Sequence, residues 1–189
     1  MCYGTPENLI IKKAICDLWN ELVGGASVHC NLHSNSRRVD AQAIIEKTTA
    51  MMYLANCGVR VFGAIGQLSV DEVFSPVMAI IDREIIKTGD RLMRSLGNLW
   101  DDSLDTVEIV LEGLQDRSYL NLESTVDKFR GFFDFDILAS YENCAAWMAG
   151  GFKGIEEKAR DEVKALTASH DFYLSEEKAR EVNKLADNF

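Results

Sequence analysis

Carboxylate side chains recur at helical spacing in the middle of the chain. Asp101, Asp105, Glu108, Glu112 and Asp116 follow one another at intervals of four, three, four and four residues, which places them on one face of a helix. Such a stripe has three interpretations: a solvated outer face, a surface that binds a basic partner, or part of a divalent-metal site. We expect the stripe to bind a basic protein surface.

A second pair of carboxylates makes the metal alternative concrete. Facing helices can direct carboxylates at one Mg²⁺ ion, which takes oxygen ligands and commonly bridges substrate phosphates. The segments Asp105-Thr-Val-Glu108 and Glu123-Ser-Thr-Val-Asp127 resemble the ExxE and ExxD motifs of the all-α NTP pyrophosphohydrolases, the MazG-like and dimeric dUTPase-like enzymes. They depart from that pattern in one residue type and in one extra residue of spacing. The resemblance implies a Mg²⁺ site formed by Asp105, Glu108, Glu123 and Asp127.

The stretch ASVHCNLHSNSRR holds two of the three histidines and a pair of arginines. His29 and His33 are four residues apart, a spacing that places two zinc ligands on one side of a helix. The glycines, serines and asparagines around them predict a polar connector instead, and a zinc site needs a third ligand. Arg37 and Arg38 lie just before an expected helix, where they would either hold a phosphate or nucleic acid or mark a solvated helix start.

Helical periodicity dominates the elements that must position these residues. Apolar side chains recur at intervals of three and four through the segments 6–23, 39–55, 76–96, 101–116, 121–135, 137–149, 154–168 and 175–189. Pro6 and Pro76 both occupy helix starts, although the SVDE sequence at 69–72 has the form of a capping box and favours an earlier start. We interpret the glycine-rich segment 57–67 as helix followed by a bend, with a short strand at 59–62 as the alternative.

These patterns predict an all-α fold, a compact bundle of about seven to nine helices, or two small helical subdomains. With 189 residues, of which 47% are apolar, the chain is long enough to bury a core. Its charge is uneven, because residues 1–100 are neutral overall and the whole net charge of −10 falls in residues 101–189. We expect these two helical parts to form one continuous globular unit.

The cysteines and the hydropathy pattern bear on the compartment. The five cysteines are widely spaced and include no CxxC pair, which favours reduced thiols over a disulfide framework. No apolar run is long enough to cross a membrane, and the first residues lack a signal-peptide pattern. We therefore expect a cytoplasmic protein in a reducing environment, with no membrane partner.

The functional expectation follows mainly from charge. No Walker loop, GxSxG or GxGxxG motif occurs in the sequence. We expect a non-enzymatic helical interaction protein without a cofactor, which presents its acidic stripe to a basic partner. This protein could form a homo-oligomer. The first alternative is a Mg²⁺-dependent nucleotide pyrophosphohydrolase. The second is a helical oligomer that binds RNA or DNA through Arg37 and Arg38.

Overall fold

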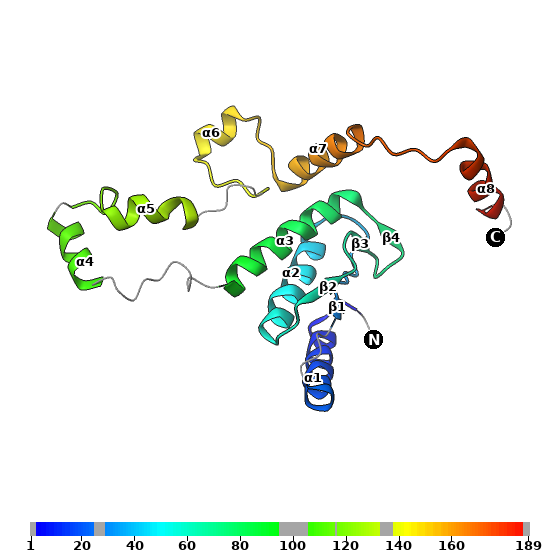
Figure 1. Ribbon diagram of the computed structural model, residues 1–189, viewed down its shortest axis with the longest axis horizontal. Helices are drawn as coiled ribbons and strands as arrows, with labels where there is room; N and C mark the ends of the chain where they lie inside the picture. Colours follow the sequence, from blue (N-terminus) through cyan, green and yellow to red (C-terminus); the bar gives the residue numbers. More distant parts are fainter. Residues whose placement is uncertain (1–2, 25–28, 95–105, 116, 133–137, 187–189) are drawn as a thin grey trace.

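The computed structural model describes residues 3–24, 29–94, 106–115, 117–132 and 138–186. The chain is mostly helical, and the described part contains eight helices and four short strands (Figure 1). The expected all-α class and helix number are confirmed. The strands were not expected in the main interpretation of the sequence, and they build the part of the molecule that holds the site described below.

Helix α1 (Pro6–Val23) begins and ends at the residues that the sequence indicates. Thr5 is the N-cap, and its hydroxyl accepts a hydrogen bond from the Asn8 N–H at 3.4 Å, while Pro6 fills the first helical position, where no N–H is needed. Gly24 ends the helix in the left-handed conformation, with φ of 68°, a backbone geometry that favours glycine.

A parallel β-α-β unit follows α1. Strand β1 (His29–Asn31), helix α2 (Ala41–Asn56) and strand β2 (Val61–Gly63) come in this order, and His29 pairs with Val61 in the first position of the register. The connector expected at 26–38 therefore contains a strand, and the helix-and-bend interpretation of 57–67 is wrong. The short-strand alternative was closer, because pairing with β1 satisfies backbone groups that a glycine-rich helix would leave weakly supported.

The next elements correct the expected capping box. Strands β3 (Gln67–Leu68) and β4 (Val73–Phe74) form an antiparallel hairpin. The SVDE segment lies in its turn, where Ser69 and Val70 have positive φ angles of 49° and 67°. The backbone N–H groups of these two residues bind the carbonyls of Ser36 and Ser34, each at 2.7 Å. Long-range backbone pairing thus takes the place of the local cap that the SVDE pattern favours.

Helix α3 (Pro76–Arg94) starts at the second of the two start signals. The hydroxyl of Ser75 accepts a hydrogen bond from the Met78 N–H at 3.2 Å, which caps the first turn. Gly89 does not break the helix. A Cβ at this position would lie 2.5 Å from the end of the Met51 side chain, so the glycine instead lets α2 pack closely against α3.

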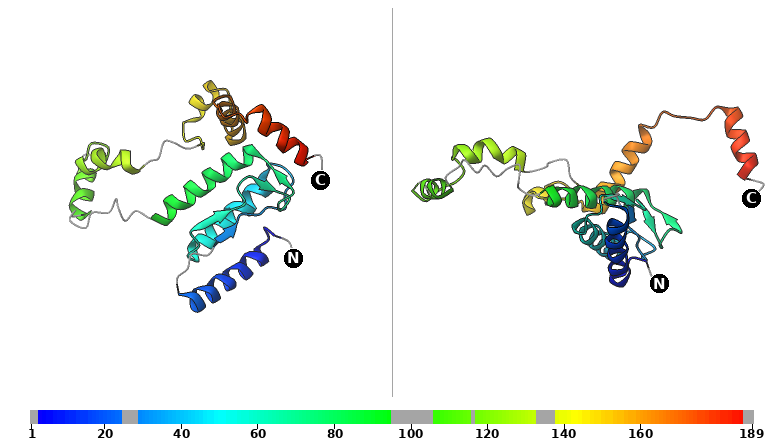
Figure 2. Two further views of the ribbon diagram at one scale, coloured as in Figure 1. Left: turned by 45° about the vertical axis from the view of Figure 1, so that its right-hand side comes forward. Right: turned by 60° about the horizontal axis from the view of Figure 1, so that its bottom comes forward.

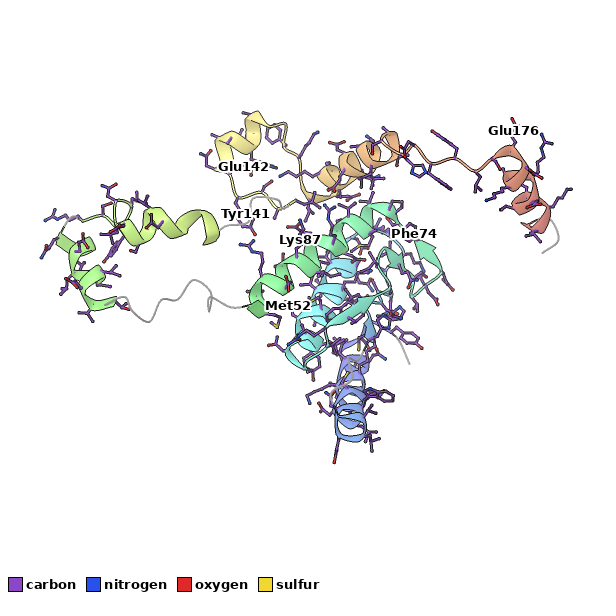
Figure 3. The ribbon with its side chains drawn as sticks, viewed as in Figure 1. Met52, Phe74, Lys87, Tyr141, Glu142 and Glu176 are labelled. Carbon is purple, nitrogen blue, oxygen red and sulfur yellow. The ribbon has the colours of Figure 1, made fainter. Side chains whose placement is uncertain are left out.

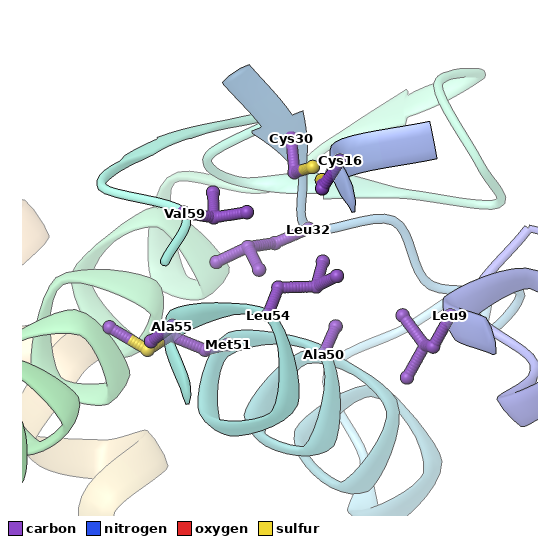
Figure 4. Close-up of a cluster of buried hydrophobic side chains, with 9 residues drawn as sticks. All are labelled: Leu9, Cys16, Cys30, Leu32, Ala50, Met51, Leu54, Ala55 and Val59. Carbon is purple, nitrogen blue, oxygen red and sulfur yellow. The ribbon is translucent and has the colours of Figure 1, made fainter. Parts of the chain in front are cut away.

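Two clusters of buried apolar side chains hold the body together. One joins α1, β1 and α2 around Leu32, Leu54 and Val59 (Figure 4). The other lies between α2, α3 and α7, and it includes Met78, Ile81, Leu138 and Ala159. These residues come from distant parts of the sequence, which ties residues 138–168 to the N-terminal body.

Five helices follow α3 in the part of the chain that the structure describes. They are α4 (Thr106–Gln115), α5 (Glu123–Phe132), α6 (Cys144–Ala149), α7 (Ile155–Ala168) and α8 (Glu176–Ala186). Helix α7 packs along α3, whereas α4, α5 and α8 extend away from the body in all three views (Figures 1 and 2). Phe74 on the hairpin of the body and Glu176 on α8 are both exposed (Figure 3).

No helix in the described part of the chain has the length and apolar content needed to span a bilayer. Helix α1 is long enough at 18 residues. However, it carries charged residues such as Lys13 and Asp17, which form a salt bridge on its surface.

Candidate functional site

Polar and aromatic side chains gather just beyond the carboxyl end of β1. We define the β1-end cluster as Tyr3, His33, Ser34, Asn35 and Glu46. Strand β1 leads directly into three of these residues, the N-terminal segment supplies the tyrosine, and α2 supplies the glutamate. In open sheets with parallel strands, ligands commonly bind outside the carboxyl ends of the strands, so this location favours a binding site.

The carboxylate of Glu46 organises the β1-end cluster. Its Oε2 accepts hydrogen bonds from the Ser34 hydroxyl at 2.8 Å and from the Asn35 backbone N–H at 2.7 Å, and its Oε1 accepts one from Gln42 Nε2 at 2.9 Å. An ionised carboxylate has about four acceptor positions. These three bonds fix the side chain and leave about one acceptor position for a ligand.

The N-terminal segment closes over this carboxylate. A Cβ on Gly4 would lie 3.1 Å from Glu46 Oε2, and the φ of Gly4 is +80°, so a larger residue would be strained here. The Asn35 side-chain amide donates a hydrogen bond to the Tyr3 carbonyl. Glycine is therefore needed to bring the tyrosine backbone over the end of the strand.

Two aromatic rings of the β1-end cluster contact each other. The ring centroids of Tyr3 and His33 are 5.0 Å apart at an interplanar angle of 53°. His33 Nδ1 lies 3.1 Å from the Val70 carbonyl, which anchors the imidazole, and Tyr3 is 46% exposed. An open aromatic face suits a cation with apolar substituents.

Helix α2 is fixed to the same end of β1 by its cap. Asp40 Oδ1 accepts hydrogen bonds from the Ala43 N–H at 3.0 Å and the Ser36 hydroxyl at 2.8 Å. These bonds, with the backbone bond as the largest contribution, lower the pKa of the Asp40 carboxyl. The cap thus sets the position of the first turn of α2, from which Glu46 projects one turn later.

A fully buried ion pair connects α2 to α3 behind the β1-end cluster. Lys47 Nζ lies 2.7 Å from Asp82 Oδ2, and both side chains are 0% exposed. The Gly66 backbone N–H also donates to Asp82 Oδ2 at 2.7 Å, and Lys47 donates to the Ala64 carbonyl at 3.3 Å. The pair therefore joins two helices to the loop that follows β2.

Burial shifts both members of this pair toward their neutral forms. Loss of hydration raises the pKa of Asp82 and lowers the pKa of Lys47, while their mutual attraction opposes both shifts. Among the described residues, Asp82 Oδ1 is buried without a hydrogen-bond partner. A pair buried in this way is poorly placed to exchange protons with solvent. We therefore assign Lys47 and Asp82 a structural role.

An open groove of about 680 Å³ is lined by residues of α2, of α3 and of the segment around β2. Its walls are mainly apolar, and its charged side chains are engaged in the protein. Arg60 donates to the carbonyls of Ala55 and Val59 at 2.8 and 3.0 Å, and Arg83 forms a 2.7 Å salt bridge with Glu162. Its arginines are therefore occupied, which makes the groove a weaker candidate for a polar ligand than the β1-end cluster.

Two cysteines meet in the core below α1. Cys16 and Cys30 are both buried, and their sulfur atoms face each other (Figure 4). Burial, together with the neighbouring Cys16 thiol, raises the pKa of Cys30 to about 11. The thiol is thus protonated at neutral pH and serves as core.

The predicted metal ligands do not form a site in the described part of the chain. There, no three His, Cys, Asp or Glu side chains gather closely enough to hold a metal ion. Glu108 lies on α4, while Glu123 and Asp127 lie on α5. Asp105 lies outside the described residues.

The other predicted site residues are solvent-facing or fall outside the description. On the acidic stripe, Glu108 and Glu112 are exposed on α4, and Asp101, Asp105 and Asp116 lie outside the described residues. Arg37 and Arg38 are exposed before α2, and Arg38 Nε lies 3.4 Å from Asp40 Oδ2. His29 is exposed on β1, whereas His33 belongs to the β1-end cluster.

The residues that sequence reasoning missed carried a weak signal. Lys47 follows Ala43 by four residues and precedes Met51 by four, so a charged side chain occupies the inward stripe of a predicted amphipathic helix. Asp82 occupies a similar position beside Ile81. A charge on an apolar stripe indicates a buried pair, but no local pattern identifies which acid and base meet.

Comparison with known families gives one result for nearly the whole chain. The family model for trimethylamine methyltransferase (MTTB) matches residues 1–184. No curated protein matches the chain.

This result corrects the functional expectation from charge. The family match points to a protein related to methyltransferases, not to a non-enzymatic interaction protein, a nucleotide pyrophosphohydrolase or a nucleic-acid-binding oligomer. Charge misled because an acidic stripe on an exposed helix has the same sequence pattern whether or not it binds anything.

Proposed function

The chain belongs to the trimethylamine methyltransferase (MTTB) family, and on that premise we propose that it is an enzyme of methyl transfer that binds a small methylated amine at the β1-end cluster. The observation that carries the proposal is the family match over residues 1–184. The β1-end cluster is the part of the described structure whose chemistry suits such a ligand.

Protonated trimethylamine has one N–H donor and three methyl groups around a positive charge. Glu46 has about one acceptor position left after its three hydrogen bonds within the protein. The rings of Tyr3 and His33 contact each other in the same cluster, and in this proposal they offer faces to the methyl groups and the charge. One N–H donor thus meets one acceptor position, and the apolar part of the ligand meets aromatic surface.

Methyl transfer from such an amine requires the nitrogen to carry a positive charge. A nucleophile then attacks the methyl carbon, the carbon–nitrogen bond breaks, and its electron pair stays on nitrogen, so that neutral dimethylamine leaves. A carboxylate beside the nitrogen favours the protonated amine, because an opposite charge at close range stabilises the charged form. In this proposal Glu46 holds the proton on nitrogen, and the nucleophile comes from another molecule.

The buried pair behind the β1-end cluster supports this role indirectly. Lys47 follows Glu46 directly on α2 and is tied to Asp82 at 2.7 Å. A side chain that must meet a ligand within a few tenths of an ångström works best on a rigid helix with packed neighbours. Lys47 and Asp82 are positioning residues here and do not contact the amine.

The test is binding of trimethylamine by the full chain, measured by ligand-observed NMR at neutral pH. We expect binding that weakens about tenfold or more in Glu46→Gln, since a charge-assisted contact is lost, and several-fold in Tyr3→Leu, since a cation–π contact contributes about 0.5–2 kcal/mol. The control Glu108→Gln changes an exposed carboxylate on α4. Equal binding by all four proteins would place the ligand elsewhere.

A further inference from the structure

Two free thiols meet in the apolar cluster that joins α1 to β1. Cys16 lies on α1 and Cys30 on β1, and their sulfur atoms point toward each other (Figure 4). The two side chains share a hydrogen bond, so the sulfur atoms are in contact. A disulfide joins two cysteines only where the backbone already brings their side chains together, and this pair meets that condition.

The side chain of Lys12 lies beside both thiols. Its Nζ donates to the carbonyl of Asn31 at 2.9 Å, and its charge acts on the sulfur atoms of Cys30 and Cys16. Burial raises the pKa of Cys30 to about 11, and the Lys12 charge opposes that shift. A nearby ammonium group favours the thiolate, which is the form of cysteine that reacts with oxidants.

Helix α1 is held to the body by few side chains. Of its 18 residues, only Asn8, Leu9 and Cys16 are buried. Segments with few buried contacts open locally at a low cost in free energy. Brief opening of α1 exposes both thiols to water and to a small oxidant, and closing brings the two sulfur atoms back into contact.

We propose that Cys16 and Cys30 form a disulfide when the protein meets hydrogen peroxide, and that this bond locks α1 onto β1. One thiolate attacks a peroxide oxygen, the O–O bond breaks, and a sulfenic acid and hydroxide form. The second thiolate attacks the sulfenic sulfur, the S–O bond breaks, and a second hydroxide leaves. The protons lost by the two thiols convert both hydroxides to water. Two thiols are oxidised to one disulfide, and one peroxide is reduced to two waters.

The disulfide changes how firmly α1 is attached. It cross-links two positions 14 residues apart and limits the opening of α1 that exposes the thiols. Helix α1 follows directly on the N-terminal segment that carries Tyr3, whose carbonyl accepts the hydrogen bond from Asn35. Oxidation therefore also holds that segment at the end of β1. The disulfide itself does not depend on the amine site.

The test is a peptide map of the folded full chain after treatment with hydrogen peroxide. The peroxide is removed, free thiols are blocked with iodoacetamide in urea, and no reductant is added. Cleavage after glutamate places the five cysteines on five different peptides, so the mass of a cross-linked pair identifies its members. We expect peptides 8–21 and 22–46 to be joined through Cys16 and Cys30, and dithiothreitol to separate them.

The sequence supplies a matched control, because Cys2 and Cys16 are also 14 residues apart. In concentrated urea the cost of closing a loop depends mainly on its length, so the 2–16 and 16–30 cross-links should form in similar amounts. In the folded chain the 16–30 cross-link should exceed the other by about tenfold or more, because the fold holds these two sulfur atoms together. Similar amounts in the folded chain would overturn the proposal, and so would the absence of the 16–30 cross-link.

Thermal unfolding tests whether the bond locks α1. The oxidised wild type should melt at a higher temperature than the same sample after dithiothreitol. Cys57→Ala changes a half-buried cysteine at the end of α2 and should keep this difference, whereas Cys16→Ala should lose it. Circular dichroism confirms that each variant is folded. A difference that persists in Cys16→Ala would contradict the proposal, and the peptide map of the wild type decides it even where a variant does not fold.

Discussion

Two regions of this molecule carry charged residues on helices and place them in opposite environments. In α2 and α3, Lys47 and Asp82 meet at 2.7 Å with 0% exposure. In α4, Glu108 and Glu112 are exposed, away from the body (Figure 1). The comparison teaches that a few buried charges mark the structured site more reliably than a long acidic stripe, because burial of a charge requires a dedicated partner.

Breaking the buried pair should have the largest effect. Lys47→Met leaves the Asp82 carboxylate buried without its cation, and we expect the free energy of unfolding to fall by about 3–5 kcal/mol. Urea unfolding followed by circular dichroism measures the change. The control Lys13→Met removes one partner of an exposed pair and should leave the unfolding curve nearly unchanged, because water screens exposed ion pairs.

A double variant sharpens this prediction. In Lys47→Met/Asp82→Leu no uncompensated charge remains, so the loss should be smaller than the sum of the two single losses. Strictly additive losses would show that the two side chains do not stabilise one another. The buried pair would then not be what positions α2.

The next largest loss of stability is expected at Gly66, a glycine at positive φ whose surroundings are packed, and it is compared with Gly151, a glycine at positive φ with open surroundings. Gly66 has φ of +77°, and a Cβ there would lie 2.6 Å from the Phe74 ring. Gly66→Ala should destabilise by about 1–3 kcal/mol and disturb the N–H that binds Asp82. At Gly151, φ is +88° but no atom lies within 4 Å of the added Cβ, so thermal unfolding should show the smaller loss in Gly151→Ala.

A pH-dependent effect at the α2 cap should be smaller. The lowered pKa of Asp40 means that its ionised form stabilises the fold above the unfolded pKa of about 3.9. That contribution is lost as the pH falls through the lower folded-state pKa. Asp40→Asn keeps a capping side chain but does not ionise. The wild type should exceed the variant in thermal stability at neutral pH, and the gap should close below about pH 4. A difference in thermal stability that does not change with pH would show that ionisation of Asp40 is not its cause.

Changing the exposed carboxylates of α4 should have the smallest effect. Glu108→Lys alters a side chain at the surface, and substitutions of this kind usually change stability by no more than about 0.5 kcal/mol. Urea unfolding under the conditions used for Lys47→Met gives a direct comparison. A loss as large as that of Lys47→Met would mean that this carboxylate stabilises the fold as strongly as the buried pair does.

Local signals in the sequence predicted the helices well. Thr5-Pro6 and Ser75-Pro76 start α1 and α3 where capping and proline geometry require. The SVDE segment was misread because its turn conformation depends on the carbonyls of Ser34 and Ser36, which lie more than thirty residues earlier. The strands were equally hard to identify, since two or three residues give too short a period to recognise.

The β1-end cluster could be predicted only in part. The sequence singled out His33 because histidines are rare in this chain, but it did not single out the other residues of the cluster. Tyr3 and Glu46 come from segments far apart in sequence, and Asn35 joins them by donating its side-chain amide to the Tyr3 carbonyl and its backbone N–H to Glu46. Charge patterning pointed instead to the acidic stripe, which is conspicuous in sequence because solvated helix faces tolerate many charges.

The most direct test of the central claim is the backbone amide spectrum of the ¹⁵N-labelled full chain during a titration with trimethylammonium chloride. The Asn35 N–H donates to Glu46 at 2.7 Å, so it should shift with the ligand in a saturable way, and more than with equal concentrations of sodium chloride. The Gly154 N–H binds a carboxylate of Glu157 at 3.0 Å, far from β1, and serves as the control that should not respond. An Asn35 amide that stays in place, or one that shifts no more than the Gly154 amide, would contradict a methylated-amine site at the end of β1.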